Sequence, residues 1–157
     1  RPLAPVKKVF LDTNVFVSGL LDVSADSACR SILEALEARR LRSCVTAWHC
    51  CLEFFSVTTR LPPEYRLSAE SAIALLTEHV FDRVQVEGLP VEAAIPWLKR
   101  LGGSEVRGGL VYDAHLAHIA HRAGCATLVT SNLSHFRQVA PHGIEILSPT
   151  QFIGRMV

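Results

Sequence analysis

The sequence predicts an α/β protein in which a central parallel sheet of about five strands lies between two layers of helices. Short runs of β-forming apolar residues alternate with longer segments whose apolar residues recur at helical spacing. Neighbouring parallel strands need crossover connections, and helices supply them. The length of 157 residues is typical of one domain with a sizeable core. We therefore expect a three-layer α/β/α sandwich in which residues 1–157 form a single domain and residues 1–7 a flexible leader.

The composition excludes several other classes of protein. A content of 49% hydrophobic and 20% charged residues is that of an ordinary globular protein. No apolar run is long enough to span a membrane, because Glu53 and Asp113 interrupt the two candidates, and residues 1–8 lack the apolar region of a signal peptide. The five cysteines are odd in number and lie mostly in apolar segments, which predicts reduced thiols and a cytoplasmic location. The net charge of +1 neither requires nor excludes a nucleic-acid partner.

The first half of the chain begins with a buried strand. Val9, Phe10 and Leu11 form an apolar run of β character that stops at Asp12, where the chain turns into the next element. The elements expected after it are a helix from Asp26 or Ser27 to about Arg40, a strand at 42–46 and a helix at 47–59 capped by Thr46.

The second half continues the alternation of helices and strands. A helix at 68–81 should bury its apolar side chains, and the alternating pattern at 82–87 predicts a strand near the sheet edge. The side chains expected to be buried by that helix are Ala72, Ile73, Leu75, Leu76 and Val80. A helix expected at 90–101 should be kinked or divided by Pro96, and a flexible loop should follow at 102–109. The next helix should run from Leu110 or Val111 to Ala123 and end at Gly124. The last expected elements are strands at 126–130 and 144–147 and a short helix opened by Pro149.

Acidic and polar side chains occur where the predicted strands end. Asp12 and Asn132 each follow a strand, and Asp113 lies in the first turn of the helix that leads to the Asn132 strand. Ligands of open α/β sheets bind beyond the carboxyl ends of the strands. Glu53 lies in a helix among apolar residues, where a carboxylate needs a partner or a metal ion. A crevice at the sheet end could collect all four residues.

Each acid also has a purely structural interpretation. Asp12 could simply cap a helix, and Asp113 could complement a helix dipole. Glu53 could face outward in a narrow polar stripe with His49 and Ser56.

The acids favour a particular chemistry if they do gather. Carboxylates that crowd together repel one another, and a cation relieves that repulsion. Ligands that are all oxygen select hard ions such as Mg²⁺ or Mn²⁺ rather than zinc. Such ions clamp phosphate oxygens and activate water at neutral pH. The pattern therefore points to the hydrolysis of phosphodiesters.

Four stretches of the chain together resemble the PIN domain family, in the order and spacing of that family. They are Leu11-Asp12-Thr13-Asn14, Cys51-Leu52-Glu53-Phe54-Phe55-Ser56-Val57, Val111-Tyr112-Asp113-Ala114-His115-Leu116-Ala117 and Leu128-Val129-Thr130-Ser131-Asn132-Leu133-Ser134-His135-Phe136. The resemblance implies a parallel sheet of about five strands between helices and a Mg²⁺- or Mn²⁺-dependent endoribonuclease. Most often such a protein is the VapC-like toxin of a bacterial toxin–antitoxin pair, which implies an RNA substrate, an antitoxin partner and a homodimer.

The resemblance also assigns roles to individual residues. Asp12, Glu53 and Asp113 match the metal-binding acids of the family. Asn132 stands where many members have a fourth aspartate, which leaves a second metal ion less well supported. Two polar residues match positions that shape the site, and they are Asn14 and Thr130. The basic residues that could contact RNA phosphates are Arg39, Arg40, Arg60 and Arg107.

Three other functions remain open from the sequence. His115, His118 and His121 recur every three residues and could bind a transition metal or act as acid and base, although a semi-exposed stripe is the simpler interpretation. Asp12 could instead be a nucleophile that forms an aspartyl-phosphate, although Asn14 replaces the second aspartate typical of such phosphatases. The third possibility is a catalytically weak PIN-like module that binds RNA or acts as a scaffold.

Overall fold

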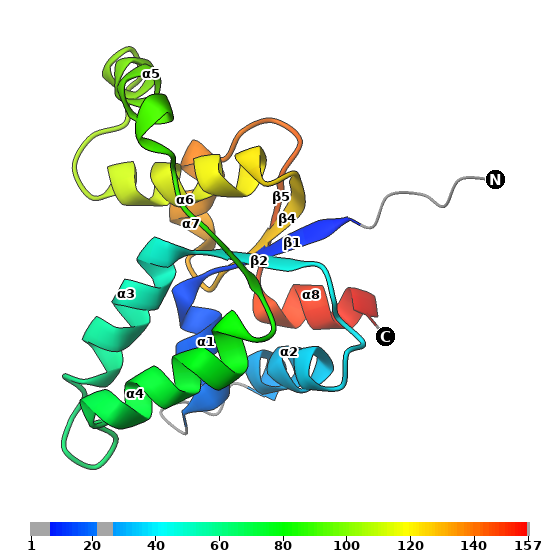
Figure 1. Cartoon of the computed structure of the whole chain (residues 1–157). Helices are drawn as coiled ribbons and strands as arrows, with labels where there is room; N and C mark the ends of the chain where they lie inside the picture. The colour runs from blue at the N-terminus through cyan, green and yellow to red at the C-terminus, as the bar shows by residue number, and fades with distance from the viewer. Residues whose placement is uncertain (1–6, 22–26, 157) are drawn as a thin grey trace.

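The computed structural model describes residues 7–21 and 27–156, and its centre is a sheet of five parallel strands (Figure 1). The strand order is β3-β2-β1-β4-β5, so the N-terminal strand lies in the middle. The strands are β1 (Lys8–Leu11), β2 (Cys44–Ala47), β3 (Gln85–Glu87), β4 (Cys125–Val129) and β5 (Glu145–Leu147). The leader predicted at residues 1–7, apart from Lys7, and the cap predicted at Asp26 lie outside the described residues.

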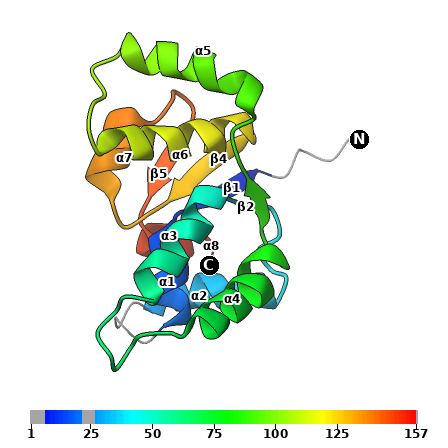
Figure 2. The ribbon, with the colours of Figure 1, turned by 60° about the vertical axis from the view of Figure 1, so that its left-hand side comes forward.

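Helices cover both faces of the sheet, which confirms the predicted three-layer α/β/α sandwich (Figures 1 and 2). Helices α1, α2 and α8 lie on one side of the strands, whereas α6 and α7 lie on the other. The helical segments are α1 (Thr13–Leu20), α2 (Ser27–Glu37), α3 (Trp48–Thr58), α4 (Ala69–Leu76), the π-helix η1 (Thr77–Phe81), α5 (Val91–Gly102), α6 (Leu110–Arg122), α7 (Leu133–Val139) and α8 (Pro149–Met156).

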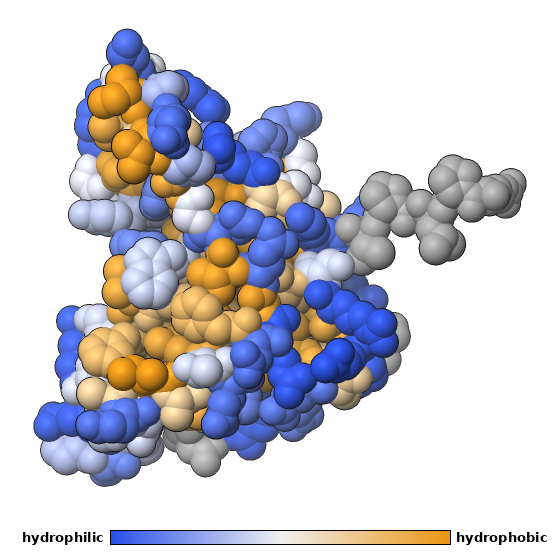
Figure 3. All heavy atoms as spheres, viewed as in Figure 1, coloured by the Kyte–Doolittle hydropathy of each residue, from blue (hydrophilic) through white to orange (hydrophobic). Residues whose placement is uncertain are grey.

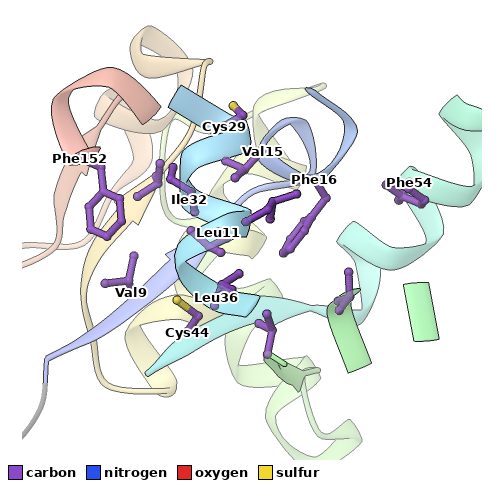
Figure 4. Close-up of a cluster of buried hydrophobic side chains, with 14 of the residues drawn as sticks. Val9, Leu11, Val15, Phe16, Cys29, Ile32, Leu36, Cys44, Phe54 and Phe152 are labelled. Carbon is purple, nitrogen blue, oxygen red and sulfur yellow. The ribbon is translucent and has the colours of Figure 1, made fainter. Parts of the chain in front are cut away.

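The central strand β1 contributes to both halves of the core because successive side chains of a strand point to opposite faces. Val9 and Leu11 pack with Ile32 of α2 and Phe152 of α8 (Figure 4). Phe10 points the other way and packs in a second cluster with residues of α6 and α7. Burial on both faces explains why this strand is a continuous apolar run rather than an alternating one.

Two predicted features at the start of α3 and the end of α2 are wrong. Thr46 does not cap α3, because its hydroxyl donates instead to the carbonyl oxygen of Leu11 at 2.8 Å, and α3 begins at Trp48 without a side-chain cap. Helix α2 ends at Glu37 rather than near Arg40. Arg39 adopts a left-handed conformation with φ of 56°, and the backbone N–H of Arg40 bonds to Ala35 across the helix end. This is a Schellman-type ending built without the glycine that usually signals it.

The second half of the chain follows the prediction with local differences. As expected, β3 is an edge strand and Gly124 ends the α6 region with φ of 81°. The helix predicted at 68–81 is α4, which Ser68 caps, followed by the π-helix η1. The predicted burial of Ile73 is wrong, because its side chain is 55% exposed. Helix α5 runs across Pro96 without being divided. Helix α7 was not predicted, because it has only seven residues and follows β4 after a short turn.

Among residues 7–21 and 27–156, none of the helices combines the length and the apolar character that crossing a membrane would require.

Candidate active site

The site forms where β1 and β4 end side by side. Leu11 and Val129 are paired in the sheet, so the residues that follow them, Asp12 and Thr130, emerge together at its carboxyl edge. The Asp12 backbone N–H donates to the carbonyl oxygen of Val129, at 3.1 Å, and extends the strand pairing to the carboxylate. Asp12 is therefore placed at the edge where open α/β sheets bind their ligands.

Hydrogen bonds fix the Asp12 carboxylate, which is only 6% exposed. Its Oδ1 accepts from the backbone N–H of Thr13 at 2.8 Å. Its Oδ2 accepts from the Thr130 hydroxyl at 2.8 Å and from the Asn14 amide at 3.2 Å. Asp12 thus caps α1 and also lies in the candidate site, so the two interpretations of this residue are compatible.

Asn14 and Thr130 connect the two strand ends. The Asn14 Oδ1 accepts from the backbone N–H of Ser131 at 3.1 Å, and the Thr130 hydroxyl accepts from the backbone N–H of Asn132 at 3.0 Å. The turn after β1 and the turn after β4 are thereby held against each other, with Asp12 between them.

The other two acids each have a histidine partner. Glu53 projects from α3, and its Oε1 lies 2.7 Å from His49 Nε2 while its Oε2 accepts from the Thr13 hydroxyl at 3.2 Å. Asp113, in the first turn of α6, has its Oδ2 3.4 Å from His135 Nδ1. Within the polar stripe that was the structural alternative for Glu53, His49 and Glu53 contact each other directly at the edge of the site. The partner histidines were not predicted, although the spacing of four residues between His49 and Glu53 on one helix was a usable signal.

One open pocket of about 290 Å³ collects the three acids and Asn132. It lies between the carboxyl edge of the sheet and helices α1, α3 and α6, and its lining residues are Asp12, Thr13, Asn14, Val17, Ser18, Glu53, Val57, Tyr112, Asp113, Leu116 and Asn132. Sequence reasoning missed Thr13, Ser18 and Tyr112. The structure thus brings together four residues that are far apart in the chain.

Burial and like charges make ionisation of the acids unfavourable. The pKa of Asp12 is raised from 3.8 to about 6, mainly by burial and to a smaller extent by the charges of Glu53 and Asp113, whereas the hydrogen bonds from Thr130 and Thr13 act in the opposite direction. Burial also raises the pKa of Asp113, and His135 opposes that shift. A cation in the pocket would lower the free energy of the ionised acids.

The oxygen atoms of the pocket are of the kind that bind a hard divalent ion, but the three carboxylates are too far apart in this structure to bind one ion together. Within the described ranges, no three His, Cys, Asp or Glu side chains are gathered closely enough to hold a metal ion. The carboxylates of Glu53 and Asp113 are instead engaged by His49 and His135. The polar side chains that line the pocket carry carboxylate, amide and hydroxyl oxygens and include no histidine or cysteine, a donor set that would suit Mg²⁺ or Mn²⁺ if Glu53 and Asp113 exchanged their histidines for the ion.

Asn132 lines the pocket next to Asp113. Its Nδ2 lies 2.9 Å from His135 Nδ1, the atom that also faces the Asp113 carboxylate. That nitrogen cannot accept a hydrogen bond from the amide and donate one to the carboxylate at the same time. The contact between His135 Nδ1 and Asn132, at 2.9 Å, is the shorter of the two, and the contact between His135 Nδ1 and the Asp113 carboxylate, at 3.4 Å, is the weaker interaction.

The predicted phosphate-binding arginines do not line this pocket. Arg39 and Arg40 follow α2 at the opposite edge of the sheet, where β2 begins, and Arg39 lines a separate pocket there. Arg60 follows α3. The Arg107 guanidinium donates to loop carbonyl oxygens, including that of Ser104 at 2.8 Å.

The three histidines of α6 do not form one group. His118 is buried and stacks on Trp97 with ring centroids 4.1 Å apart, so the expected semi-exposed stripe is wrong at this residue. Burial lowers its pKa to about 4, and Arg100 contributes to the shift. The part of the chain that the structure describes contains no group of histidines that could bind a transition metal.

Sequence comparison identifies relatives of the chain. The model of the PIN domain family matches residues 8–134. Ribonuclease VapC27 of Mycobacterium tuberculosis is 33% identical over 103 residues, which cover 64% of this chain and 73% of that protein.

Solved structures share the fold. One is a DNA-bound VapBC complex from Salmonella typhimurium, with a TM-score of 0.62 at 21% identity, covering 92% of this chain and 99% of that one. Another is VapBC2 from Rickettsia felis bound to a promoter DNA fragment, with a TM-score of 0.59 at 17% identity, covering 89% and 97% of the two chains. The likeness extends over nearly the whole chain, and the match to the family covers Asp12, Glu53, Asp113 and Asn132. This chain belongs to the PIN domain family.

Proposed function

We propose that the protein is a Mg²⁺- or Mn²⁺-dependent endoribonuclease that hydrolyses RNA phosphodiesters. The observation that carries the proposal is that Asp12, Glu53 and Asp113 line one open pocket at the carboxyl edge of the sheet. The similarity to Ribonuclease VapC27 supports RNA as the substrate. We further propose a cytoplasmic location, which the buried thiols of Cys44, Cys50, Cys51 and Cys125 support because thiols stay reduced there.

The residues of the pocket have distinct roles in this proposal. Asp12 is the fixed ligand, because Thr13, Asn14 and Thr130 hold its carboxylate in place. Glu53 and Asp113 are the adjustable ligands, since Glu53 is paired with His49 and the Thr13 hydroxyl and Asp113 with His135, contacts that a bound ion could displace. A bound divalent ion supplies an activated water molecule and neutralises charge on the phosphate.

Asn132 sets the expected number of ions. Its amide can offer a neutral oxygen to an ion or to a water molecule, but it adds no negative charge. We therefore propose one ion held by Asp12, Asp113 and Glu53, and any second ion held weakly until the RNA phosphate contributes charge.

We also propose that the protein is the toxin of a VapBC-type pair, binds an antitoxin protein and forms a homodimer. The solved VapBC complexes, which share its fold, support the antitoxin partner. Exposed apolar side chains support protein partners: Val91, Ile95 and Leu98 recur on one face of α5 and are 84%, 60% and 58% exposed (Figure 3).

The proposal predicts metal-dependent cleavage with defined products. Incubation of total RNA with the protein and Mg²⁺ or Mn²⁺ should give internal cuts with 5′-phosphate and 3′-hydroxyl ends, because a water molecule attacks the phosphorus. EDTA should abolish the cuts, and added Mn²⁺ should restore them.

The same assay separates the alternatives. Cleavage that persists in EDTA, or products with 2′,3′-cyclic phosphate ends, would contradict metal-dependent hydrolysis and favour histidine chemistry. RNA that is bound but left intact in Mn²⁺ would favour the alternative of a binding or scaffolding module.

A further inference from the structure

The geometry points to a nucleobase-binding subsite beside the three acids, and we propose that the exposed ring of Tyr112, supported by His49, stacks on an unpaired base of the substrate. The subsite makes single-stranded RNA the preferred substrate class. This inference rests on the proposed function, because it names the substrate of the same pocket.

Tyr112 is positioned directly at the acid pocket. It precedes Asp113 in the first turn of α6, and both residues line the pocket. A base stacked on this ring would therefore place its own backbone phosphates close to the acids.

The ring of Tyr112 is held by a second ring from another helix. His49 of α3 stacks on it with centroids 5.7 Å apart and an interplanar angle of 8°, which is an offset parallel arrangement. His115 packs edge-on against His49, at 6.4 Å and 88°. His49 is also bonded to Glu53 at 2.7 Å. Contacts with α3 and α6 therefore fix the orientation of His49 before a base arrives, and His49 in turn supports Tyr112.

No structural role explains the exposure of Tyr112. Its side chain is 61% exposed, and within the described residues its hydroxyl makes no hydrogen bond. A large aromatic ring that stays exposed contributes less to the stability of the folded state than one that is buried. The part of the ring that is open to solvent borders a pocket that would receive a polyanion with flat aromatic bases.

Stacking on such a ring selects unpaired RNA. An aromatic side chain stacked on a base stabilises the complex whichever base is present, because every base has a π-face. Bases within a duplex are already stacked on their neighbours, whereas bases of single strands, loops and bulges can turn outward onto a protein ring. The subsite therefore favours unpaired RNA without reading a particular sequence.

Binding to metal-free protein tests the subsite separately from catalysis. The probe is a short unstructured RNA that carries the fluorescent base 2-aminopurine, titrated in EDTA so that no cleavage occurs. Tyr112→Ala should weaken binding about tenfold. Tyr112→Phe should bind within about twofold of wild type, because the ring remains. Tyr65→Ala is the matched control: it removes the other tyrosine of the chain, which does not line the pocket, and should have no effect.

A series of RNAs with single abasic sites identifies the contact. At one position, loss of the base should weaken binding to wild type about as much as Tyr112→Ala does, and should not weaken binding to Tyr112→Ala further. The same RNA annealed to its complement should bind wild type more weakly than the single strand. Thermal melts of each variant confirm that the fold is intact.

The outcomes distinguish this inference from the proposed function. Equal affinity of wild type and Tyr112→Ala for the probe, additive effects at every abasic position, or no binding of the probe to wild type would each overturn the subsite. Binding that follows the predicted pattern, in a protein that does not cleave RNA with Mn²⁺ present, would support the subsite and contradict the ribonuclease proposal alone.

Discussion

Asp12→Asn is expected to lower the rate of RNA cleavage on the order of 10³-fold, because the fixed ligand of the ion loses its charge. The fold should remain intact. Asparagine caps a helix about as well as aspartate, so the start of α1 is preserved. The measurement is the initial rate of cleavage of a defined RNA at saturating Mn²⁺, together with the circular dichroism spectrum of each protein.

A matched carboxylate outside the pocket provides the control. Asp82→Asn removes the same charge from an exposed residue that does not line the acid pocket, and it should keep wild-type activity. If Asp12→Asn keeps wild-type activity as well, then Asp12 is only a helix cap and the catalytic role is wrong.

The second large effect concerns the pH dependence of stability in the metal-free protein. The pKa of Asp12 is about 6 in the folded state and 3.8 in the unfolded chain, so the folded state binds the proton more tightly. Its contribution to the free energy of unfolding is therefore fully present below pH 3.8 and is lost as the pH rises through 6. The difference in pKa corresponds to about 3 kcal/mol.

The protonation of His118 also changes between pH 4 and pH 6.5, and its effect on the free energy of unfolding has the opposite sign to that of Asp12. Its pKa falls from 6.5 to about 4 on folding, so protonation below pH 6.5 favours the unfolded state. The two residues offset each other in the wild type, and the pH dependence of the wild type alone does not isolate Asp12. The difference between wild type and Asp12→Asn does, because His118 is present in both.

Urea unfolding of both proteins in EDTA, from pH 8 to pH 4, measures this difference. Relative to wild type, Asp12→Asn should be about 2 kcal/mol less stable at pH 4 than it is at pH 7, because pH 4 already lies slightly above the pKa of 3.8. A difference that stays constant with pH would mean that the Asp12 carboxylate is not destabilised by folding.

The sequence was sufficient to predict the strands and the acid, Asp12, that follows the first of them. Val9, Phe10 and Leu11 form an apolar run because β1 is buried on both faces, and the alternating pattern before Glu87 reflects the edge position of β3. The rule that the carboxyl ends of parallel strands meet at one edge predicted the place of Asp12 and Asn132. Glu53 and Asp113 lie in helices, and the resemblance to the PIN domain family was needed to assign them to the same site. The order of the strands, which sets Asp12 beside Thr130, required the structure.

Features that depend on tertiary contacts were not predicted from the sequence. The Thr46 hydroxyl could serve as a cap or bond to a neighbouring strand, and only the position of Leu11 decides between them. The end of α2 at Arg39 lacks a glycine signal, since here an arginine takes the left-handed conformation. His135 is distant in sequence from Asp113, and α7 brings them together. The sequence named the acids and placed His49 in a stripe with Glu53, but it did not indicate that His135 pairs with Asp113.

Calorimetric titration with Mn²⁺ tests most directly the central claim that three acids act as one metal site. Wild type should bind one ion per chain. Asp12→Asn, Glu53→Gln and Asp113→Asn should each weaken binding by about tenfold or more, because each removes a charged ligand. Glu64→Gln, an exposed control outside the pocket, should bind Mn²⁺ like wild type. Equal Mn²⁺ affinity in wild type and in the three pocket variants would contradict the claim.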